Sequence, residues 1–158
     1  MLIHPFPPIV SENSKTLILG SFPSVKSRET LFYYGNERNR FWQVVAFILG
    51  EQTPVTIEQK KQFILSHDLA LWDVIFSCDI VGSSDSSIQN AVANDIKGLI
   101  ARSKIERIFT NGKKAEKLYI DLVERSVGIK SVCLPSTSPA NAAFSFEKLV
   151  EKWKIILK

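Results

Sequence analysis

The stretch KTLILGSFPS, residues 15–24, decides the fold, because it joins an apolar strand directly to a loop of small residues. Residues 15–20 form an apolar run of strand length, and the segment GSFPS that closes the stretch consists largely of turn formers. A strand that runs into a tight turn is the typical first unit of a chain in which strands alternate with helices. The stretch therefore predicts an α/β fold with a polar loop at the end of its first strand.

The same unit recurs along the chain. Strand-like runs return at residues 69–75, 105–112 and 129–136, with helical apolar stripes between them. This alternation predicts one domain, residues 1–158, built as a three-layer α/β/α sandwich around a central four-stranded parallel sheet. Helices are expected at residues 41–49, 57–67, 115–123 and 146–157. The first of them ends at Gly50, and the second begins behind a capping box formed by Thr56 and Gln59. A further helix is expected after Ser87 as its cap, and its apolar face consists of Ile88, Val92, Ile96, Leu99 and Ile100.

Composition limits the classes of function. A hydrophobic fraction of 45% with 23% charged residues is that of a globular protein, and no apolar run is long enough to span a bilayer. Cys78 and Cys133 lack metal-ligand spacing, so we expect buried cysteines in a reducing cytoplasm. Two histidines, His4 and His67, are too few for a histidine metal centre. The net charge of +4 favours polyanionic partners only mildly.

Four polar segments meet at one edge of the predicted sheet, because the carboxyl ends of parallel strands lie together. These segments are GSFPS, WDVIFSCD, TNGKKA and LPSTSPAN, one after each strand. Neither histidine is predicted at this edge, which excludes a Ser/His/Asp triad, and no motif carries two carboxylates for classical two-acid glycoside hydrolysis. Asparagines, hydroxyls, backbone dipoles and aromatic rings remain, and they suit a reaction that mainly needs electrostatic support.

Several residues at this edge have a structural and a functional interpretation. Asn39 precedes a helix and is equally suited to cap it. The consecutive rings Phe32, Tyr33 and Tyr34 cannot all face one core, so at least one is expected at the surface, where it can stack on a flat base. Asn111 lies in a turn signal. Asp73 and Asp85 are the nearest carboxylates; Asp73 is equally suited to bond a neighbouring loop, and Asp85 to start a helix.

Taken together, GSFPS, YYGNERNRFW, LWDVI followed by GSSDSSI, TNG and LPSTSPAN resemble the uracil-DNA glycosylase superfamily. Within it they are most similar to the hypoxanthine-DNA (deoxyinosine) glycosylase group, and they cover residues 20–141 in order. The resemblance implies damaged DNA as the partner of a monomeric enzyme, a base flipped out of the duplex, and hydrolysis of its N-glycosidic bond. It implies no metal and no cofactor.

The resemblance also implies roles for individual residues. GSFPS matches the water-activating motif, but Phe22 stands where many relatives carry Asp or Asn, and Asn39 is then the catalytic residue. Leu134 replaces the histidine or asparagine that opens the second motif in other branches, which argues against uracil-type stabilisation of the leaving group from this position. The base-binding residues are expected to be Gly20, Ser21, Phe22, Pro23, Tyr34, Phe41 and Asn111, and the DNA-binding residues Ser24, Lys26, Arg38, Pro135, Ser136, Thr137 and Ser138.

Two alternatives remain open at this point. The substrate could be uracil or a mismatched pyrimidine, with the same reaction. The fold could also serve a nonenzymatic module that binds nucleic acid without cutting the glycosidic bond. An intact Asn39 and an intact LPSTSPAN segment favour catalysis over the binding module.

Overall fold

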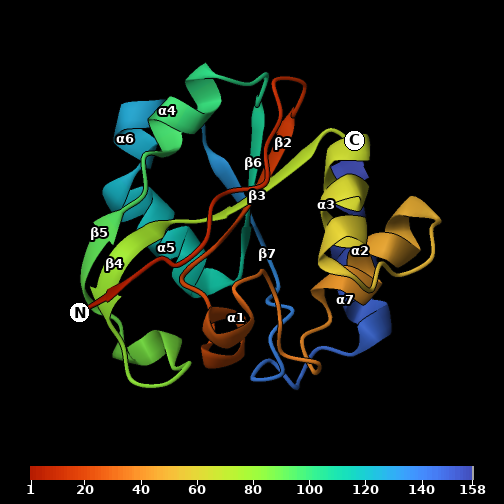
Figure 1. Cartoon of the computed structure of the whole chain (residues 1–158), viewed down its shortest axis with the longest axis horizontal. Coiled ribbons are helices and arrows are strands. Elements are labelled where there is room, and N and C mark those ends of the chain that lie inside the picture. Colours follow the sequence, from red (N-terminus) through yellow and green to blue (C-terminus); the bar gives the residue numbers. More distant parts are fainter. Residues whose placement is uncertain (158) are drawn as a thin grey trace.

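A computed structural model describes residues 1–157, and its centre is a sheet of parallel strands (Figure 1). The strand order is β3–β2–β6–β7, and Leu19 lies in register with Trp72 on one side and Thr110 on the other. The predicted four-stranded parallel sheet is confirmed. The strands are β2 (Thr16–Gly20), β3 (Leu69–Asp73), β6 (Arg107–Asn111) and β7 (Ser131–Leu134).

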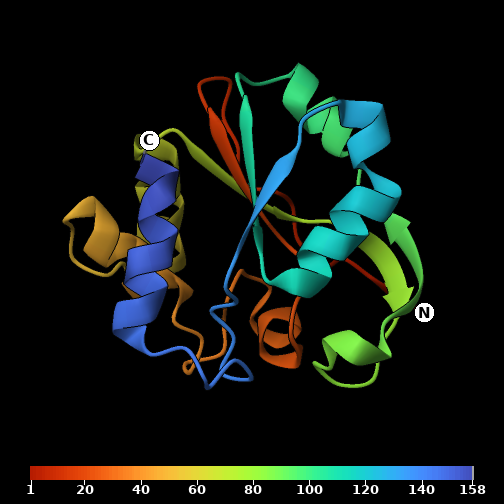
Figure 2. The ribbon, with the colours of Figure 1, turned by 180° about the vertical axis from the view of Figure 1, so that it is seen from behind.

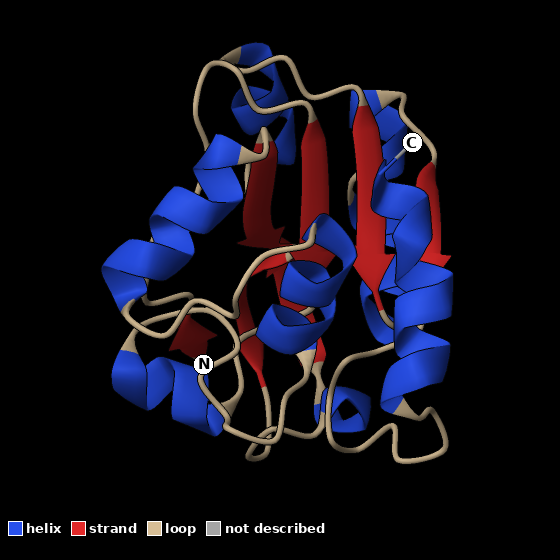
Figure 3. Ribbon diagram, turned by 90° about the vertical axis from the view of Figure 1, so that its right-hand side faces the viewer, coloured by secondary structure: helices blue, strands red, loops and turns tan. Residues whose placement is uncertain are grey.

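Helices cover both faces of this sheet and complete the three layers (Figures 1 and 3). One face carries α2 (Phe41–Leu49), α3 (Ile57–Ser66) and α7 (Phe146–Trp153), and the other carries α4 (Ile96–Ala101), α5 (Lys113–Leu122) and α6 (Glu124–Val127). The short α1 (Val25–Thr30) lies beyond the end of β2, and two 3₁₀ turns are η1 (Asp85–Ser87) and η2 (Lys154–Leu157). Within residues 1–157, no helix has the length and apolarity needed to cross a membrane.

Strand β2 is the element on which both layers pack. Leu17, Ile18 and Leu19 are all fully buried, as expected for a strand covered on both faces. Ile18 packs in the core under α2 and α7, whereas Leu17 and Leu19 pack in the core under α4 and α5. The period-two alternation of strand side chains thus divides three consecutive apolar residues between two cores.

A second, smaller sheet replaces half of one predicted helix. Its order is β1–β4–β5, all antiparallel, with β1 (Leu2–Ile3), β4 (Ile75–Asp79) and β5 (Gln89–Ala93). The helix predicted after Ser87 is therefore wrong over its first turns, because this segment pairs with β4 as an edge strand. The helix begins only at Asp95, whose side chain accepts a 2.9 Å hydrogen bond from the Gly98 amide.

The two cysteines have different environments. Cys78 in β4 is buried, as expected, but Cys133 in β7 is exposed. The prediction for Cys133 is wrong because β7 is an edge strand of the parallel sheet, which leaves part of it uncovered. The two residues are free thiols.

The position of Ile18 between sheet and helices gives a stability prediction. An Ile18→Ala substitution should lower the free energy of unfolding by about 2–5 kcal/mol, because it leaves a cavity in a closely packed core. The same substitution at Ile120, which is 48% exposed on α5, should cost far less. Urea unfolding of the two variants measures both values. Equal losses would contradict the assignment of β2 to the centre of the fold.

Candidate active site

The loops at the carboxyl ends of the four parallel strands enclose one cavity of about 240 Å³. Seen from behind, the loop after β7 runs beside the segment before α2 at this end of the sheet (Figure 2), and the Arg40 amide donates to the Thr137 carbonyl across them. The cavity is smaller than most pockets for drug-sized ligands, which suits a single flat ring. Of the residues predicted for the site, its lining includes Gly20, Ser21, Phe22, Pro23, Ser24, Tyr34, Asn39, Asn111, Ser136, Thr137 and Ser138.

Gly20 allows the strand end to approach the cavity floor. A Cβ atom at this position would collide with Asp73 Oδ1 and would lie 3.5 Å from the Tyr34 hydroxyl oxygen. Any larger residue at position 20 would therefore displace the Asp73 carboxylate from the cavity floor. The next residue, Ser21, is buried, and its hydroxyl donates a 2.7 Å hydrogen bond to Asp85 Oδ1.

Tyr34 is the ring that reaches the cavity. Phe32 and Tyr33 are buried in the core, whereas Tyr34 turns away from them through a left-handed backbone conformation with φ of 53°. One of the three consecutive rings was expected at the surface; Tyr34 is half-buried, packs against the core and lines the cavity. Tyr34 stacks on Phe41 with ring centroids 4.2 Å apart and an interplanar angle of 19°.

Phe41 itself is fully buried behind Tyr34 and is not part of the cavity lining. Its predicted contact with a base is wrong, because the Tyr34 ring lies in front of it. Phe41 instead holds one face of Tyr34 by stacking. Burial raises the pKa of the Tyr34 phenol well above its usual value, and the Asp73 charge adds to this effect. The hydroxyl stays protonated at neutral pH and has no hydrogen-bond partner among residues 1–157.

Asn39 precedes Arg40, the N-cap residue of α2, and lines the cavity. Its Oδ1 accepts a 2.9 Å hydrogen bond from the Phe41 amide at the start of α2 and a 2.8 Å hydrogen bond from the Thr137 hydroxyl. A backbone N–H can only donate, so this contact fixes which end of the amide is oxygen. The Nδ2 group is then the part of Asn39 available to a ligand, and it can only donate.

Thr137 links Asn39 to the end of β6. Asn111 Oδ1 accepts from the Thr137 amide at 3.0 Å, and Asn111 Nδ2 donates to the Thr137 hydroxyl at 3.0 Å. Because Thr137 is fully buried, its predicted contact with the DNA backbone is wrong. Its hydrogen bonds are made inside the protein, where they connect the end of β6, the loop after β7 and the segment before α2. Its neighbours Ser136 and Ser138 are half-buried and line the cavity.

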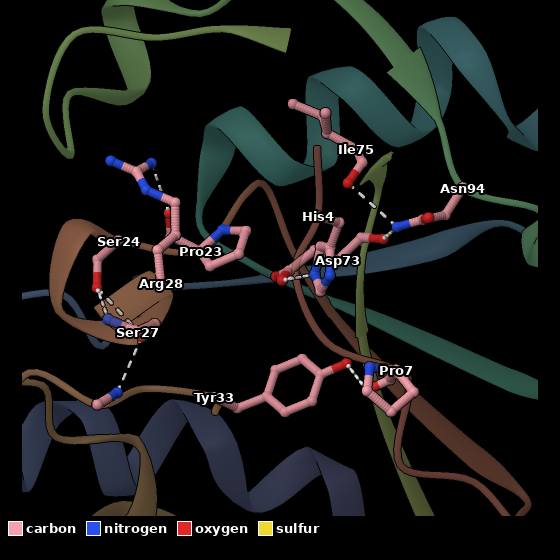
Figure 4. A network of polar contacts seen from close by, with 11 residues as sticks. His4, Pro7, Pro23, Ser24, Ser27, Arg28, Tyr33, Asp73, Ile75 and Asn94 are labelled. Atoms are coloured by element: carbon pink, nitrogen blue, oxygen red, sulfur yellow. Dashed lines mark hydrogen bonds and ion pairs between the residues drawn. The ribbon is translucent and has the colours of Figure 1, made fainter. Parts of the chain in front are cut away.

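A histidine lies behind the cavity floor, contrary to the sequence prediction. His4 Nε2 lies 2.7 Å from Asp73 Oδ2, and both side chains are almost completely buried (Figure 4). Residue 4 reaches this position through β1 and the segment that follows it, which no local pattern predicts. Asn94 fixes the same turn, since its Nδ2 donates to the carbonyls of Asp73 at 2.9 Å and Ile75 at 3.1 Å (Figure 4).

The fold also brings a second carboxylate to the cavity, from a different segment. Asp85 lies in η1, between β4 and β5, and both Asp85 and Asp73 line the cavity. Asp85 as a residue is exposed at the rim, but its carboxylate packs against Ser21. Burial of the carboxylate raises the pKa of Asp85, the Asp73 charge raises it further, and the Ser21 hydrogen bond and Lys114 act in the opposite direction.

The remaining predicted DNA-binding residues lie outside the cavity. Lys26 and Arg38 are exposed beside it, and Lys26 Nζ lies 4.0 Å from Glu29. Pro135 is half-buried and its carbonyl accepts a 2.9 Å hydrogen bond from Trp153 Nε1. In the part of the chain that the structure describes, no group of three or more acidic, histidine or cysteine side chains is placed to hold a metal ion.

A small polar cavity at the carboxyl edge of a parallel sheet, with a stacked tyrosine beside a fixed amide, is typical of an α/β protein that binds a nucleobase. The family model of the uracil DNA glycosylase superfamily matches residues 7–157. The chain belongs to the uracil-DNA glycosylase superfamily.

Individual relatives are similar over the whole chain. A protein of Methanosarcina acetivorans named "Hypoxanthine DNA glycosylase" is 38% identical, with 100% of this chain and 99% of the relative covered. A second protein of that name, from Methanosarcina barkeri, is 30% identical over 86% of each chain. A solution NMR structure from M. acetivorans, described as a candidate uracil DNA glycosylase, superimposes with a TM-score of 0.81 at 34% identity, covering 99% of this chain and 100% of that one.

The buried hydroxyl of Thr137 leads to a stability prediction. Thr137→Val keeps the side-chain shape but leaves polar groups of Asn39 and Asn111 without their partner, so we expect a loss of about 1–3 kcal/mol in the free energy of unfolding. Thr53→Val makes the same chemical change at an exposed position and should alter stability by less than about 0.5 kcal/mol. Urea unfolding compares them, and a neutral Thr137→Val would contradict the linking role.

Proposed function

We propose that this protein is a monofunctional hypoxanthine-DNA glycosylase. It takes a flipped deoxyinosine into the cavity, hydrolyses the bond between the sugar C1′ and the base, and leaves an abasic site in the DNA. The observation that carries the proposal is the orientation of Asn39, whose Oδ1 is engaged in two hydrogen bonds, so that Nδ2 is the group left for a ligand in the cavity that Tyr34 also lines. Two relatives with this name, one matched over its full length and one over 86%, support the substrate.

The geometry suits a purine that leaves as an anion. One face of Tyr34 is covered by Phe41, so its other face is available to stack on a base. Asn39 Nδ2 is a fixed donor, and negative charge that develops on the departing base is stabilised by such a donor. Because the Asn39 amide is held by the fold before the base arrives, it needs no reorganisation during bond cleavage.

Apolar residues stand where other branches of the superfamily place polar ones. Phe22 and Leu134 are both buried, and neither side chain can accept or donate a hydrogen bond. A site built in this way depends on Asn39 for contacts to the leaving base. This supports hypoxanthine over uracil as the preferred substrate.

The first test is excision by an Asn39→Ala variant. We expect its single-turnover rate constant on a duplex with one deoxyinosine to fall about 10²–10³-fold, the usual effect of removing one preorganised donor. Asn13→Ala removes the same group from an exposed loop and should leave the rate unchanged. Labelled duplexes with deoxyinosine, deoxyuridine or deoxyxanthosine, treated with alkali after reaction, report the abasic product.

The outcomes of this test are distinct. Excision of deoxyuridine alone would replace the proposed substrate. DNA binding without an abasic product on any duplex would favour a binding module. Full activity of Asn39→Ala would remove Asn39 from the mechanism.

We further propose that Lys26 and Arg38 contact phosphates beside the cavity. Replacing both by alanine should reduce the slope of log K against log salt concentration by up to about 2, since each phosphate contact contributes about 0.9. The control is Lys97→Ala with Arg102→Ala, an exposed pair on α4 and its C-cap, at the opposite end of the sheet from α1 (Figure 1). Fluorescence anisotropy between 50 and 200 mM salt measures the slopes. Identical slopes for the two pairs would contradict these contacts.

A further inference from the structure

We propose that Asp85 is the group that activates the attacking water. This inference rests on the proposed glycosylase function and assigns a residue that lies outside the motif expected to supply the carboxylate. The GSFPS loop offers only Phe22 at that place, but Asp85 reaches the same loop from the connection between β4 and β5. Ser21 holds it there with a 2.7 Å hydrogen bond to Oδ1.

Asn39 cannot take up the proton of the water. Its Oδ1 already accepts two hydrogen bonds, from the Phe41 amide and the Thr137 hydroxyl, and its Nδ2 can only donate. The Tyr34 phenol is protonated at neutral pH because burial raises its pKa. The Asp73 carboxylate is bound through Oδ2 to His4 and is 5% exposed, and its free Oδ1 lies beside Gly20 on the cavity floor. Asp85 is the carboxylate at the rim among the described lining residues, and its Oδ2 has no hydrogen-bond partner within residues 1–157.

The depths of the two carboxylates fit a division of roles. Asp73 lies on the cavity floor beside Gly20 and Tyr34, where a flipped base would lie. Asp85 lies at the exposed rim. A nucleotide enters base first, so its sugar stays at the rim, beside Asp85 and within reach of bulk water. When two carboxylates in one cavity have different surroundings, they usually play different chemical roles.

The step then balances as follows. The oxygen of water forms a bond to C1′ while the C1′–N9 bond breaks, and the electron pair of that bond leaves with the base. One proton of the water passes to Asp85, which returns it to bulk solvent, and the departing base takes a proton from solvent. The negative charge of Asp85 also stabilises the positive charge that develops on the sugar.

The charges that face Asp85 set its pH dependence. They are Asp73 on β3 and Lys114 on α5, with His4 behind Asp73, while Arg28 of α1 donates to the Gly82 and Pro23 carbonyls nearby. Burial and Asp73 raise the pKa of Asp85 above its usual value. Because a base must be deprotonated to act, the excision rate should rise with pH through this raised pKa and then level off.

The test is Asp85→Asn, which keeps the size of the side chain and an acceptor for Ser21 but removes the basic carboxylate. With enzyme in saturating excess over a deoxyinosine duplex, we expect the rate constant to fall at least about 10²-fold. The rise of the rate with pH should also disappear in the variant. Asp121→Asn, which neutralises an exposed carboxylate on α5, should keep both the rate and the pH profile of the wild type.

Each outcome is decisive. A slow Asp85→Asn variant with a flat pH profile and a wild-type melting temperature supports the assignment. Equal loss at every pH, with the rise retained, would make Asp85 a positioning group and overturn its role as base. An unimpaired variant would overturn it outright, with the glycosylase function intact. A wild-type protein that excises no base would overturn the proposed function and, with it, the role of Asp85.

Discussion

The site depends above all on the hydrogen bond that the buried Thr137 hydroxyl donates to Asn39 Oδ1. Asn111 donates to that hydroxyl from the end of β6, so hydrogen bonds connect the end of β6, the loop after β7 and the start of α2. Reversing the donor and acceptor ends of any of these side chains would leave a buried polar atom without a partner, which would lower the free energy of unfolding. The direction of the Asn39 amide, and with it the chemistry of the cavity, follows from this chain of bonds.

The cavity combines one asparagine with two carboxylates, and the proposed mechanism separates their duties. In that mechanism Asn39 donates to the base, while Asp73 of β3 and Asp85 of η1 supply the carboxylates of the same cavity. Each carboxylate is held by one neutral or titratable neighbour, His4 or Ser21, and not by an arginine. A strong cation at either place would hold the carboxylate ionised and weaken it as a base.

The sequence predicted the parallel sheet, its flanking helices and most of the cavity lining, because apolar periodicity and turn residues are local signals. The strand β5 was missed since its Val92 and the preceding Ile88 happen to fall at helical spacing. The pairing of His4 with Asp73 joins residues 69 positions apart, so no window of sequence contains it. Phe41 and Thr137 were placed in contact with ligand because a motif gives position along the chain but not depth below the surface.

The residues that line the cavity come from segments spread between residue 6 and residue 140. Such contacts have high contact order, and structures dominated by them form late in folding, after long loops have closed. A partly folded chain or a proteolytic fragment would thus contain helices and strands but no base pocket. The base pocket, and with it the proposed activity, therefore requires nearly all of the chain to be in place.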